Sequence, residues 1–513
     1  MKKSQLSFEI SYCNVLQIFA EIIIGGIIAF VGAGALNPGL VKASIPPKEV
    51  RIVTYPAPSE EIDSTEYLVK VNGKSVNVYL AKTQHHDKKY YFAYFDFSGQ
   101  VDVKVSSSLS LKNVAILPES CGIAPVIRSP DTLEFTVRQP FKISIERDGQ
   151  NSPLLLFGNP LEENAPKQGD PGVVFFGPGI HHPGKIFLTS NQTLYVAGGA
   201  VVKGGVYAQG NHIKILGHGI IDGNDYPWKA GPTAFMLHLD KCNDVIIKDV
   251  ILRGSWFFTI VPSGCNHVSI NNVKICGSRV DNDDGIDPIN SSDINIHNCF
   301  IRTDDDCIAP KGILGYNKKN CENIVVTNCS LWTDRAHIFR IGFESEAYAM
   351  QDITAKNINV LHFKDDFRLP NWFNGAAIIL LQPSNNMPMR RLHFENFIIN
   401  DDGTDCYLIE VKPMSTGVWK ISEKNELFTE MIRYKDPGRY VKNCLFKDIS
   451  LIGKAGTRRG MINISGTDSS HTVKNITLKN IVRFGESTYS TSPEVKIGSY
   501  VSHIRFKNDC DQN

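Results

Sequence analysis

The chain has 513 residues, of which 42% are hydrophobic and 21% charged, an ordinary balance for a soluble globular protein with more than one domain. Its formal net charge is +1, so no general basic field points to nucleic acid as a partner. Any substrate must therefore be inferred from local groups of residues.

The N-terminus has the segment order of an export signal. Two lysines follow the first methionine, an uncharged stretch runs from Ile22 to Leu36, and small residues ending at Ala43 follow. That stretch is shorter than the about 20 residues of a membrane span. We expect residues 1–43 to be a signal peptide, the protein to be secreted or periplasmic, and no stable membrane insertion after its removal. An uncleaved anchor is the alternative.

The next segment, residues 44–170, is predicted to be a small antiparallel β-sandwich-like domain. Short runs alternate between apolar and polar residues, and Asn72-Gly73 is a hairpin signal between two of them. No long helical periodicity interrupts this pattern. A stretch rich in Pro, Gly and charge, residues 159–172, has the composition of a linker.

The rest of the chain, residues 171–513, repeats a short unit of strand, polar turn and strand. Copies begin at Cys242 (CNDVIIKDVIL), Cys265 (CNHVSINNVKI), Ser291 (SSDINIHNCFI) and Cys321 (CENIVVTNCSL), at intervals of 23, 26 and 30 residues. A repeat this short cannot bury its own apolar side and must stack on its neighbours. We therefore predict an all-β chain, in which a right-handed parallel β-helix follows the sandwich. A β-propeller or a sandwich array is the alternative.

Two groups of aspartates interrupt these repeats, in RVDNDDGIDPIN (279–290) and RTDDDCIAPKG (302–312). Asp305 and Asp306 follow Asp284 by 21 and 22 residues, close to one coil of the repeat. Because stacked strands lie about 4.8 Å apart, the three carboxylates are expected on the same outer face. His337 follows one longer coil later.

Crowded carboxylates suit the hydrolysis of a glycosidic bond. Like charges raise at least one pKa, so one carboxyl can donate a proton while an ionised neighbour activates water. His337 is expected to tune a carboxyl or bind a sugar hydroxyl. Arg340 would neutralise an acidic substrate or a local carboxylate. The same aspartates would also be explained by solvent-exposed turns, by a ladder of polar turns, or by calcium binding.

Several motifs resemble the polygalacturonases of glycoside hydrolase family 28, from GHGIIDGNDYPW at Gly217, through residues 254–275, to His337. Asn282-Asp283-Asp284 resembles the family's Asn-Thr-Asp motif, Asp304-Asp305-Asp306 its Gly-Asp-Asp motif, and Ala336-His337-Ile338 its Gly-His-Gly motif at the histidine alone. The resemblance implies that Asp305 is the general acid, that Asp284 and Asp306 position and deprotonate water, and that His337 supports the site. It requires no metal and no cofactor.

The substrate is less clearly indicated. The family's Arg-Ile-Lys motif, which grips a galacturonate carboxylate, is replaced by a strand with Ala377 and Ile379 at the expected positions. Substrate contacts are expected instead from Asn282, Asp283, Lys311 and Arg340. The domain ahead of the helix also resembles the architecture of the family 49 dextranases and isopullulanases, which act on neutral glucans.

We therefore expect an inverting glycoside hydrolase with a polysaccharide partner, and pectin is the first candidate substrate. Three alternatives stay open: a dextranase-like hydrolase of a neutral glucan, a calcium-dependent β-helix polysaccharide lyase, and a non-enzymatic glycan-binding β-helix. The oligomeric state cannot be inferred from the sequence.

Overall fold

The computed structural model describes residues 49–61, 66–85, 88–147, 149–312, 319–343, 345–363, 377–401, 406–413, 417–418, 433–434, 436–453 and 461–509. The predicted signal peptide, residues 1–43, lies outside these ranges. Among the described residues, no helix has the length and apolar character needed to cross a membrane.

Strands β1 to β11 form two facing sheets, and the core between them is apolar. One sheet contains, in spatial order, β1 (Arg51–Val53), β5 (Lys89–Ser98), β11 (Leu154–Pro160), β10 (Phe141–Glu146) and β7 (Ala115–Leu117), with β4 (Val78–Lys82) also paired to β5. The other contains β3 (Lys74–Val76), β2 (Tyr67–Val71), β6 (Val101–Ser107), β9 (Thr132–Val137) and β8 (Val126–Ser129). A single 3₁₀ turn, η1 (Glu119–Cys121), follows β7.

The first of these sheets departs from the predicted antiparallel pattern at one pair, because β5 and β11 run parallel. The other neighbours in both sheets are antiparallel. Buried and exposed residues alternate along β2 and along most of β6, since successive side chains of a strand point to opposite faces. The inward residues of both sheets, including Val69, Val103, Phe95 and Ile143, form one core.

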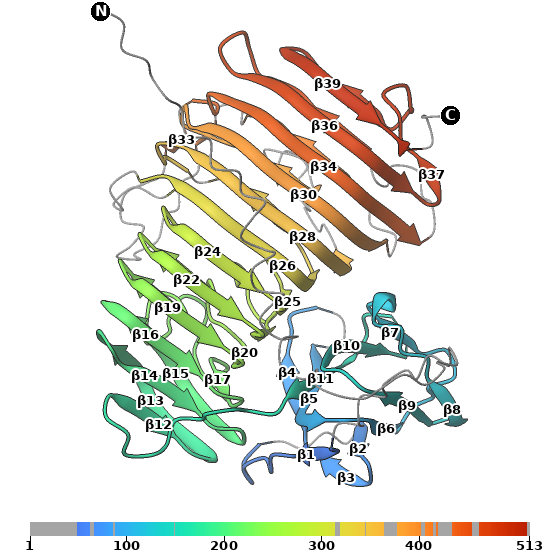
Figure 1. The fold of residues 1–513 in the computed structure, drawn as a ribbon, viewed down its shortest axis with the longest axis vertical. Helices are drawn as coiled ribbons and strands as arrows, with labels where there is room; N and C mark the ends of the chain where they lie inside the picture. The colour runs from blue at the N-terminus through green and yellow to red at the C-terminus, as the bar shows by residue number, and fades with distance from the viewer. Residues whose placement is uncertain are drawn as a thin grey trace, which may run out of the picture. The chain divides into compact units, whose positions relative to one another are not determined.

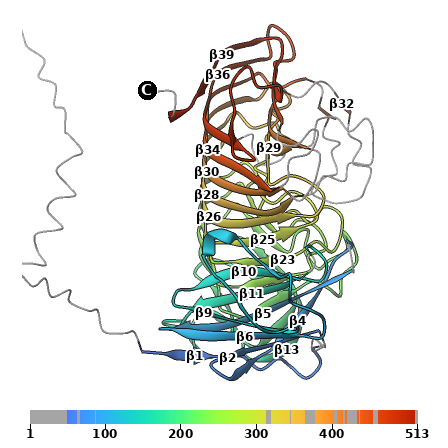
Figure 2. The ribbon, with the colours of Figure 1, turned by 90° about the vertical axis from the view of Figure 1, so that its right-hand side faces the viewer.

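From β12 onward the strands stack in parallel, coil upon coil, as Figures 1 and 2 show, except for the antiparallel pairs β36–β37 and β32–β33. The long sheet contains β12 (Val173–Phe176), β13 (Gly179–Leu188), β14 (Thr193–Val196), β15 (Ala200–Ala208), β16 (Asn211–Leu216), β17 (Ile220–Asp222), β18 (Leu237–Asp240), β19 (Asn243–Lys248), β20 (Ile251–Arg253), β21 (Ile260–Ser263), β22 (Asn266–Asn271), β23 (Lys274–Cys276), β24 (Ser292–His297), β25 (Phe300–Thr303), β26 (Cys321–Thr333), β28 (Met350–Phe363), β30 (Pro388–Asp401), β34 (Tyr440–Gly453), β36 (Thr472–Arg483), β37 (Glu486–Ser487) and β39 (Val501–Lys507).

A second parallel sheet contains β27 (Phe339–Ile341), β29 (Ala377–Leu381), β31 (Tyr407–Val411), β35 (Met461–Ile464) and β38 (Val495–Ile497), and β32 (Gly417–Val418) pairs with β33 (Arg433–Tyr434). The chain is thus all-β, with a right-handed parallel β-helix after a small, mainly antiparallel β-sandwich, and the predicted fold class is confirmed. The domain boundary at residue 170, between β11 and β12, stays a prediction.

The register shows why the repeat produces a helix. Val245 pairs with Val268 one coil later, Val268 with Ile294, and Ile294 with Ile324. These apolar residues are buried and belong to one core that continues through the successive coils. No single coil could bury this face alone, which is why the repeats must stack.

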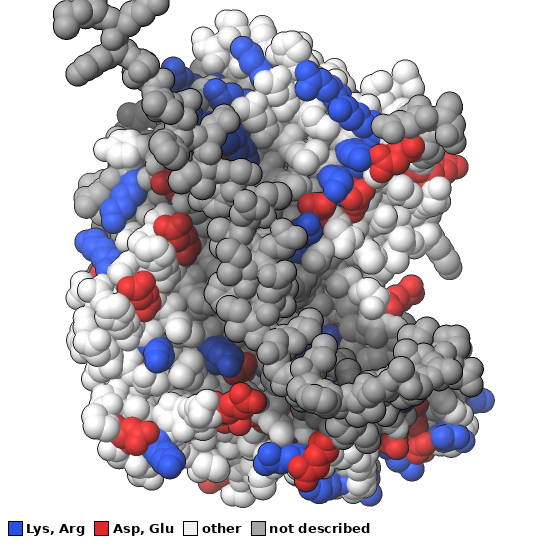
Figure 3. Space-filling view, viewed as in Figure 1, with Lys and Arg blue, Asp and Glu red and all other residues white. Residues whose placement is uncertain are grey.

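The polar turns of the repeat also stack. Asn328, Asn357 and Asn396 have φ near +57° and +58°, in the left-handed region that asparagine tolerates better than most residues. Their side-chain amides hydrogen-bond to one another along the stack, at 2.9 Å and 2.8 Å. In these coils the turn asparagine therefore serves both to turn the chain and to link neighbouring coils. On the face drawn in Figure 3, acidic and basic side chains are interspersed.

Candidate active site

The two aspartate groups and His337 lie at matching places in successive coils. Parallel backbone bridges connect one position in each of three coils: Ile286, Ile308 and Phe339. The residues two positions before these are Asp284, Asp306 and His337. Backbone hydrogen bonds from Gly285 to Asp306 (2.8 Å) and from Cys307 to His337 (2.9 Å) hold the same register. The coil period therefore stacks two carboxylates and an imidazole in one column.

Asp284, Asp305 and Asp306 form a carboxylate cluster. One oxygen of each lies within 4.8 Å of one oxygen of each of the others. Asp284 and Asp306 are buried, whereas the Asp305 side chain retains 16% of its exposure. Asp305 is thus the member of the cluster that is most open to a bound molecule.

Asp306 is surrounded by groups that stabilise its ionised form. His337 Nδ1 lies 2.7 Å from Asp306 Oδ1, and the His337 backbone N–H donates to the same oxygen at 3.1 Å. Arg340 Nη1 lies 3.8 Å from Oδ2. Burial alone would raise the pKa of Asp306, but His337, Arg340 and Lys311 outweigh it and hold this pKa well below its usual range. Asp306 is therefore a carboxylate in the working pH range, suited to accept a proton.

The pKa of Asp305, the residue before Asp306, is shifted in the opposite direction. Burial and the neighbouring charge of Asp306 raise the pKa of Asp305, while Arg335 opposes the rise. Asn282 Nδ2 donates to Asp305 Oδ2 at 3.3 Å, and Arg335 Nη2 lies 3.3 Å from the same oxygen. Two adjacent carboxyls with pKa values pushed apart provide one proton donor and one acceptor.

Asp284 shares a buried lysine with Asp287. Lys311 Nζ lies 2.7 Å from Asp284 Oδ2 and 2.7 Å from Asp287 Oδ2, and it also sits 3.9 Å from the centroid of the Phe258 ring. Burial and the charge of Asp287 raise the pKa of Asp284, and burial and the charge of Asp306 raise that of Asp287 to about 7, although Lys311 opposes both shifts. One ammonium between two buried carboxylates keeps the pair close to charge balance.

The four predicted substrate contacts all lie at the cluster but differ in accessibility. Asn282 is partly exposed beside Asp305, and Arg340 stacks on the Phe343 ring at 3.5 Å. Asp283 is fully buried and accepts backbone hydrogen bonds from Arg279 (2.9 Å) and Asp304 (2.6 Å). Lys311 is also buried. The carboxylate of Asp283 and the ammonium of Lys311 are thus engaged within the protein.

Two further residues, Arg335 and His85, take part that the sequence did not identify as site residues. Arg335 Nε lies 2.7 Å from Asp304 Oδ2 and its Nη1 lies 3.5 Å from Asp281, while His85 contacts Asp304 from the β-sandwich. Arg335 lies two positions before His337 in the chain, and that proximity was the available signal. No comparable signal marks His85.

The oxygens of the carboxylate cluster are also close enough together to hold a metal ion. Lys311, Arg335 and Arg340 already face these carboxylates, however, and a metal ion would add to that positive charge. The donor set therefore fits proton transfer better than metal binding.

Known proteins share both the motifs and the architecture. Residues 200–401 match the model described as glycosyl hydrolases family 28. An isopullulanase from Aspergillus niger is 23% identical over 73% of this chain and 77% of its own length. A polygalacturonase from Chamaecyparis obtusa is 28% identical over 38% of this chain and 39% of its own length, so this match spans about two-fifths of that relative.

The solved structure of Dex49A from Penicillium minioluteum has the same fold, with a TM-score of 0.63 and 15% identity over 88% of this chain and 96% of its own. Fold and sequence together define a glycoside hydrolase built on a parallel β-helix. Within residues 200–401 the chain resembles the polygalacturonases of family 28, and its fold also resembles the family 49 enzymes. Both of the predicted resemblances are confirmed.

Proposed function

We propose that the protein is exported and hydrolyses O-glycosidic bonds in a polysaccharide, with Asp305 as the general acid. Asp306 is the general base, and His337 keeps it ionised. The observation that carries this proposal is the pair of adjacent carboxyls in contrasting environments: burial and the charge of Asp306 raise the pKa of Asp305, whereas His337 and Arg340 lower the pKa of Asp306. Acid and base at one glycosidic bond are the minimum that the reaction requires.

Asp284 completes the arrangement as the second carboxylate for water. Its Oδ2 faces Lys311, and its Oδ1 has no hydrogen-bond partner among the described residues although it is buried. A buried oxygen of this kind gains free energy by accepting a hydrogen bond. We assign to Asp284 Oδ1 the orientation of the water that Asp306 deprotonates, and to Lys311 the orientation of Asp284 rather than contact with the sugar.

We propose inversion at the anomeric carbon, as the family resemblance implies. The oxygens that define the cluster lie within 4.8 Å, which is shorter than the about 6.5–9.5 Å between carboxyl groups of a typical two-carboxylate inverting enzyme. The carboxyl oxygens of this site are therefore closer together than those of a typical inverting enzyme. A water that Asp284 and Asp306 orient together does not have to lie directly between the acid and the base. Three closely spaced carboxyls can therefore still support inversion at the anomeric carbon.

A neutral glucan is the substrate that the site favours. Ile379 pairs with Phe339, so Ala377 occupies the place next to His337 in the following coil, and both Ala377 and Ile379 are buried. No guanidinium extends from that strand to bind a sugar carboxylate. Arg335 and Arg340 already face carboxylates of the site. The long match to an isopullulanase agrees with a neutral substrate.

Pectin is the second candidate substrate. Residues 200–401 match the family 28 model, and several matching relatives are polygalacturonases. Arg340, which lies 3.8 Å from Asp306, is the cation best placed to shift toward a galacturonate carboxylate.

The test is a panel of pullulan, dextran and polygalacturonate incubated with the purified protein, with the first-formed products identified by NMR. We expect a new reducing end of inverted configuration from one of the neutral glucans, and loss of turnover in Asp305→Asn. Asp352→Asn, a carboxylate-to-amide change on an outer turn of the helix, is the matched control and should retain full activity. A retained anomer would contradict inversion, and turnover by Asp305→Asn would contradict the assigned acid.

The same panel separates the other classes of protein. A calcium-dependent lyase would leave an unsaturated sugar and lose activity in chelator, and a glycan-binding protein would bind a polysaccharide without cleaving it. N-terminal sequencing of the mature protein tests export, with cleavage after Ala43 as the expected result.

A further inference from the structure

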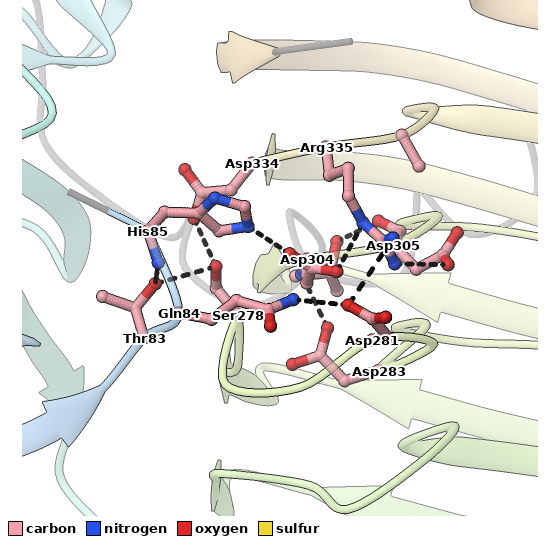
Figure 4. A network of polar contacts seen from close by, with 12 residues as sticks. Thr83, Gln84, His85, Ser278, Asp281, Asp283, Asp304, Asp305, Asp334 and Arg335 are labelled. Carbon is pink, nitrogen blue, oxygen red and sulfur yellow. Dashed lines mark hydrogen bonds and ion pairs between the residues drawn. The ribbon is translucent and has the colours of Figure 1, made fainter. Parts of the chain in front are cut away.

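Side chains of the β-sandwich contact residues that lie beside the carboxylate cluster. The chain turns between β4 and β5, and three consecutive residues of this turn reach the β-helix, as Figure 4 shows. Thr83 Oγ1 lies 3.2 Å from Ser278 Oγ, the Gln84 side chain donates to Asp281 at 2.9 Å, and His85 Nε2 contacts Asp304 Oδ1. A backbone hydrogen bond from Gln84 to Ser278, at 2.9 Å, holds this turn in place.

Asp304 connects His85 of the β-sandwich with Arg335, which in turn contacts Asp305, the proposed acid. Its side chain is fully buried; Oδ1 faces His85 and Oδ2 faces Arg335 Nε at 2.7 Å. The same guanidinium continues to Asp305, with Nη2 3.3 Å from Oδ2. A continuous series of polar contacts therefore runs from His85 through Asp304 and Arg335 to Asp305 (Figure 4).

Arg335 depends on these contacts for its position. Its side chain is 28% exposed, and a long flexible side chain at that exposure loses rotamer entropy when it is held in one place. Asp304 itself is held by its own backbone N–H, which donates to Asp283 Oδ1 at 2.6 Å, and by its two side-chain partners. Removal of His85 therefore frees one oxygen of Asp304 and lets the carboxylate rotate toward Arg335.

We infer that His85 is a positioning residue of the active site: it fixes Asp304 so that Arg335 is shared between Asp304 and the carboxyl of Asp305. This inference rests on the proposed role of Asp305 as general acid. It assigns to the β-sandwich a part in catalysis, because His85, one of the two side-chain partners of Asp304, comes from the sandwich.

The charges around Asp305 determine in which direction each variant should shift the pH profile of activity. Asp304, Asp306 and Asp284 face it with negative charge, Arg335 and Arg340 face it with positive charge, and Asn282 is neutral. His85 is faced by Asp304 and, at longer range, by Asp334. Any change that removes negative charge near Asp305 favours its ionised form, and any change that draws Arg335 away from it favours the protonated form.

His85→Ala and Asp304→Asn should therefore shift the activity profile in opposite directions. Without His85, Asp304 attracts Arg335 more strongly and Asp305 keeps its proton to higher pH, so the alkaline limb of kcat/KM moves up by about half a pH unit. With Asp304→Asn, a negative charge is lost and Arg335 turns fully to Asp305, so the alkaline limb moves down by about half a unit or more. A lower kcat should accompany both shifts.

Two further variants make the test specific. In the Asp304→Asn background, His85→Ala should produce no additional shift, because the two residues act through one contact. His85→Gln, whose side-chain amide can reach the place of Nε2, should restore most of the wild-type profile. If His85→Ala lowers the thermal midpoint too far for kinetics, His85→Gln and the double variant still test the inference.

His218→Gln is the matched control, because His218 Nδ1 lies 2.7 Å from Asp96 of the β-sandwich, on a coil that precedes both aspartate groups. It removes a histidine–carboxylate contact between the same two parts of the protein and should lower stability without moving the pH profile. An unchanged profile in His85→Ala, or additive shifts in the double variant, would overturn the inference. If wild type hydrolyses no polysaccharide, the proposed function fails, whereas hydrolysis by wild type with an unmoved His85→Ala profile contradicts this inference alone.

Discussion

His337 and Asp306 face each other across neighbouring coils, with Nδ1 of the imidazole 2.7 Å from Oδ1 of the carboxylate. This contact gives one of two adjacent aspartates a neighbour that favours negative charge. The other aspartate, Asp305, has Asp306 itself as a neighbour and is pushed toward the protonated form. The contrast between the two carboxyls, on which their proposed roles as acid and base rest, thus depends in part on a pairing between coils.

Removal of this pairing should shift the acidic limb of the activity profile. In His337→Ala, Asp306 loses its main stabilising partner, its pKa rises, and the base becomes protonated at a pH where wild type is still active. We expect the acidic limb of kcat/KM to move up by about one pH unit or more. The pH profile measures this shift, and His212→Gln, an exposed histidine on another coil, is the control that should leave it unchanged. An unmoved acidic limb would assign the base to another residue.

Lys311→Met tests the buried ion cluster through stability. Without the ammonium, Asp284 and Asp287 are left as two buried carboxyls with no shared cation, which should cost about 3–5 kcal/mol in the free energy of unfolding at neutral pH. Their raised pKa values mean that the folded state binds protons more tightly than the unfolded state. The variant's stability should therefore be greatest in acid and begin to fall above about pH 4, where carboxyls of the unfolded chain ionise. It should go on falling beyond pH 7, because loss of Lys311 raises the pKa of Asp287 above its value of about 7.

Denaturant unfolding of Lys311→Met at several pH values checks this prediction. The double variant Lys311→Met with Asp287→Asn removes one of the two carboxylates and should recover part of the loss at neutral pH. Equal destabilisation across the pH range would mean that Lys311 contributes by packing against Phe258 and not by its charge.

His218 predicts a second pH dependence, at the contact between the β-sandwich and the β-helix. The imidazole is buried, with Nδ1 2.7 Å from Asp96 of the sandwich and Nε2 3.5 Å from Asp249 of the helix. Burial would lower the pKa of His218, but the hydrogen bonds to Asp249 and Asp96 raise it to about 9. Because the folded-state pKa lies above the usual one, this stabilisation is complete below about pH 6.5 and is lost as pH rises through 9.

His218→Gln should therefore lower the thermal midpoint at pH 6 much more than at pH 10, by an amount that corresponds to roughly 3 kcal/mol at the lower pH. Scanning calorimetry at both pH values makes the comparison. His267→Gln, an exposed histidine that lies near two carboxylates, is the control and should change the midpoint little at either pH. An equal decrease in the thermal midpoint at both pH values would show that His218 stabilises the protein by packing and not by its charge.

Sequence reasoning predicted the fold and the grouping of the three carboxylates because both depend on the coil period. The spacing of Asp284, Asp305 and Asp306 is close to one coil, and the register bears that geometry out. The coil period does not, however, predict the direction in which a side chain points. Lys311, expected to contact substrate, instead bridges Asp284 and Asp287 inside the protein.

His85 lies outside what the repeat can predict. It is separated from Asp304 by 219 residues and belongs to a hairpin turn of the β-sandwich, so no periodicity connects the two. The contact depends on how the sandwich docks on the coils, through buried polar pairs such as Arg253 with Glu61. Docking of this kind is decided by shape and charge in three dimensions.

The central claim is that Asp305 donates the proton to the leaving oxygen, and leaving-group dependence tests it most directly. Asp305→Asn should be assayed on the polysaccharide that wild type cleaves and on an aryl glycoside of the same sugar, whose phenolate departs without protonation. We predict a loss of about 10²–10⁴-fold on the polysaccharide and a loss of less than about tenfold on the aryl glycoside. Asp306→Asn should lose activity on both. An equal loss on both substrates in Asp305→Asn would contradict the assignment of Asp305 as the general acid.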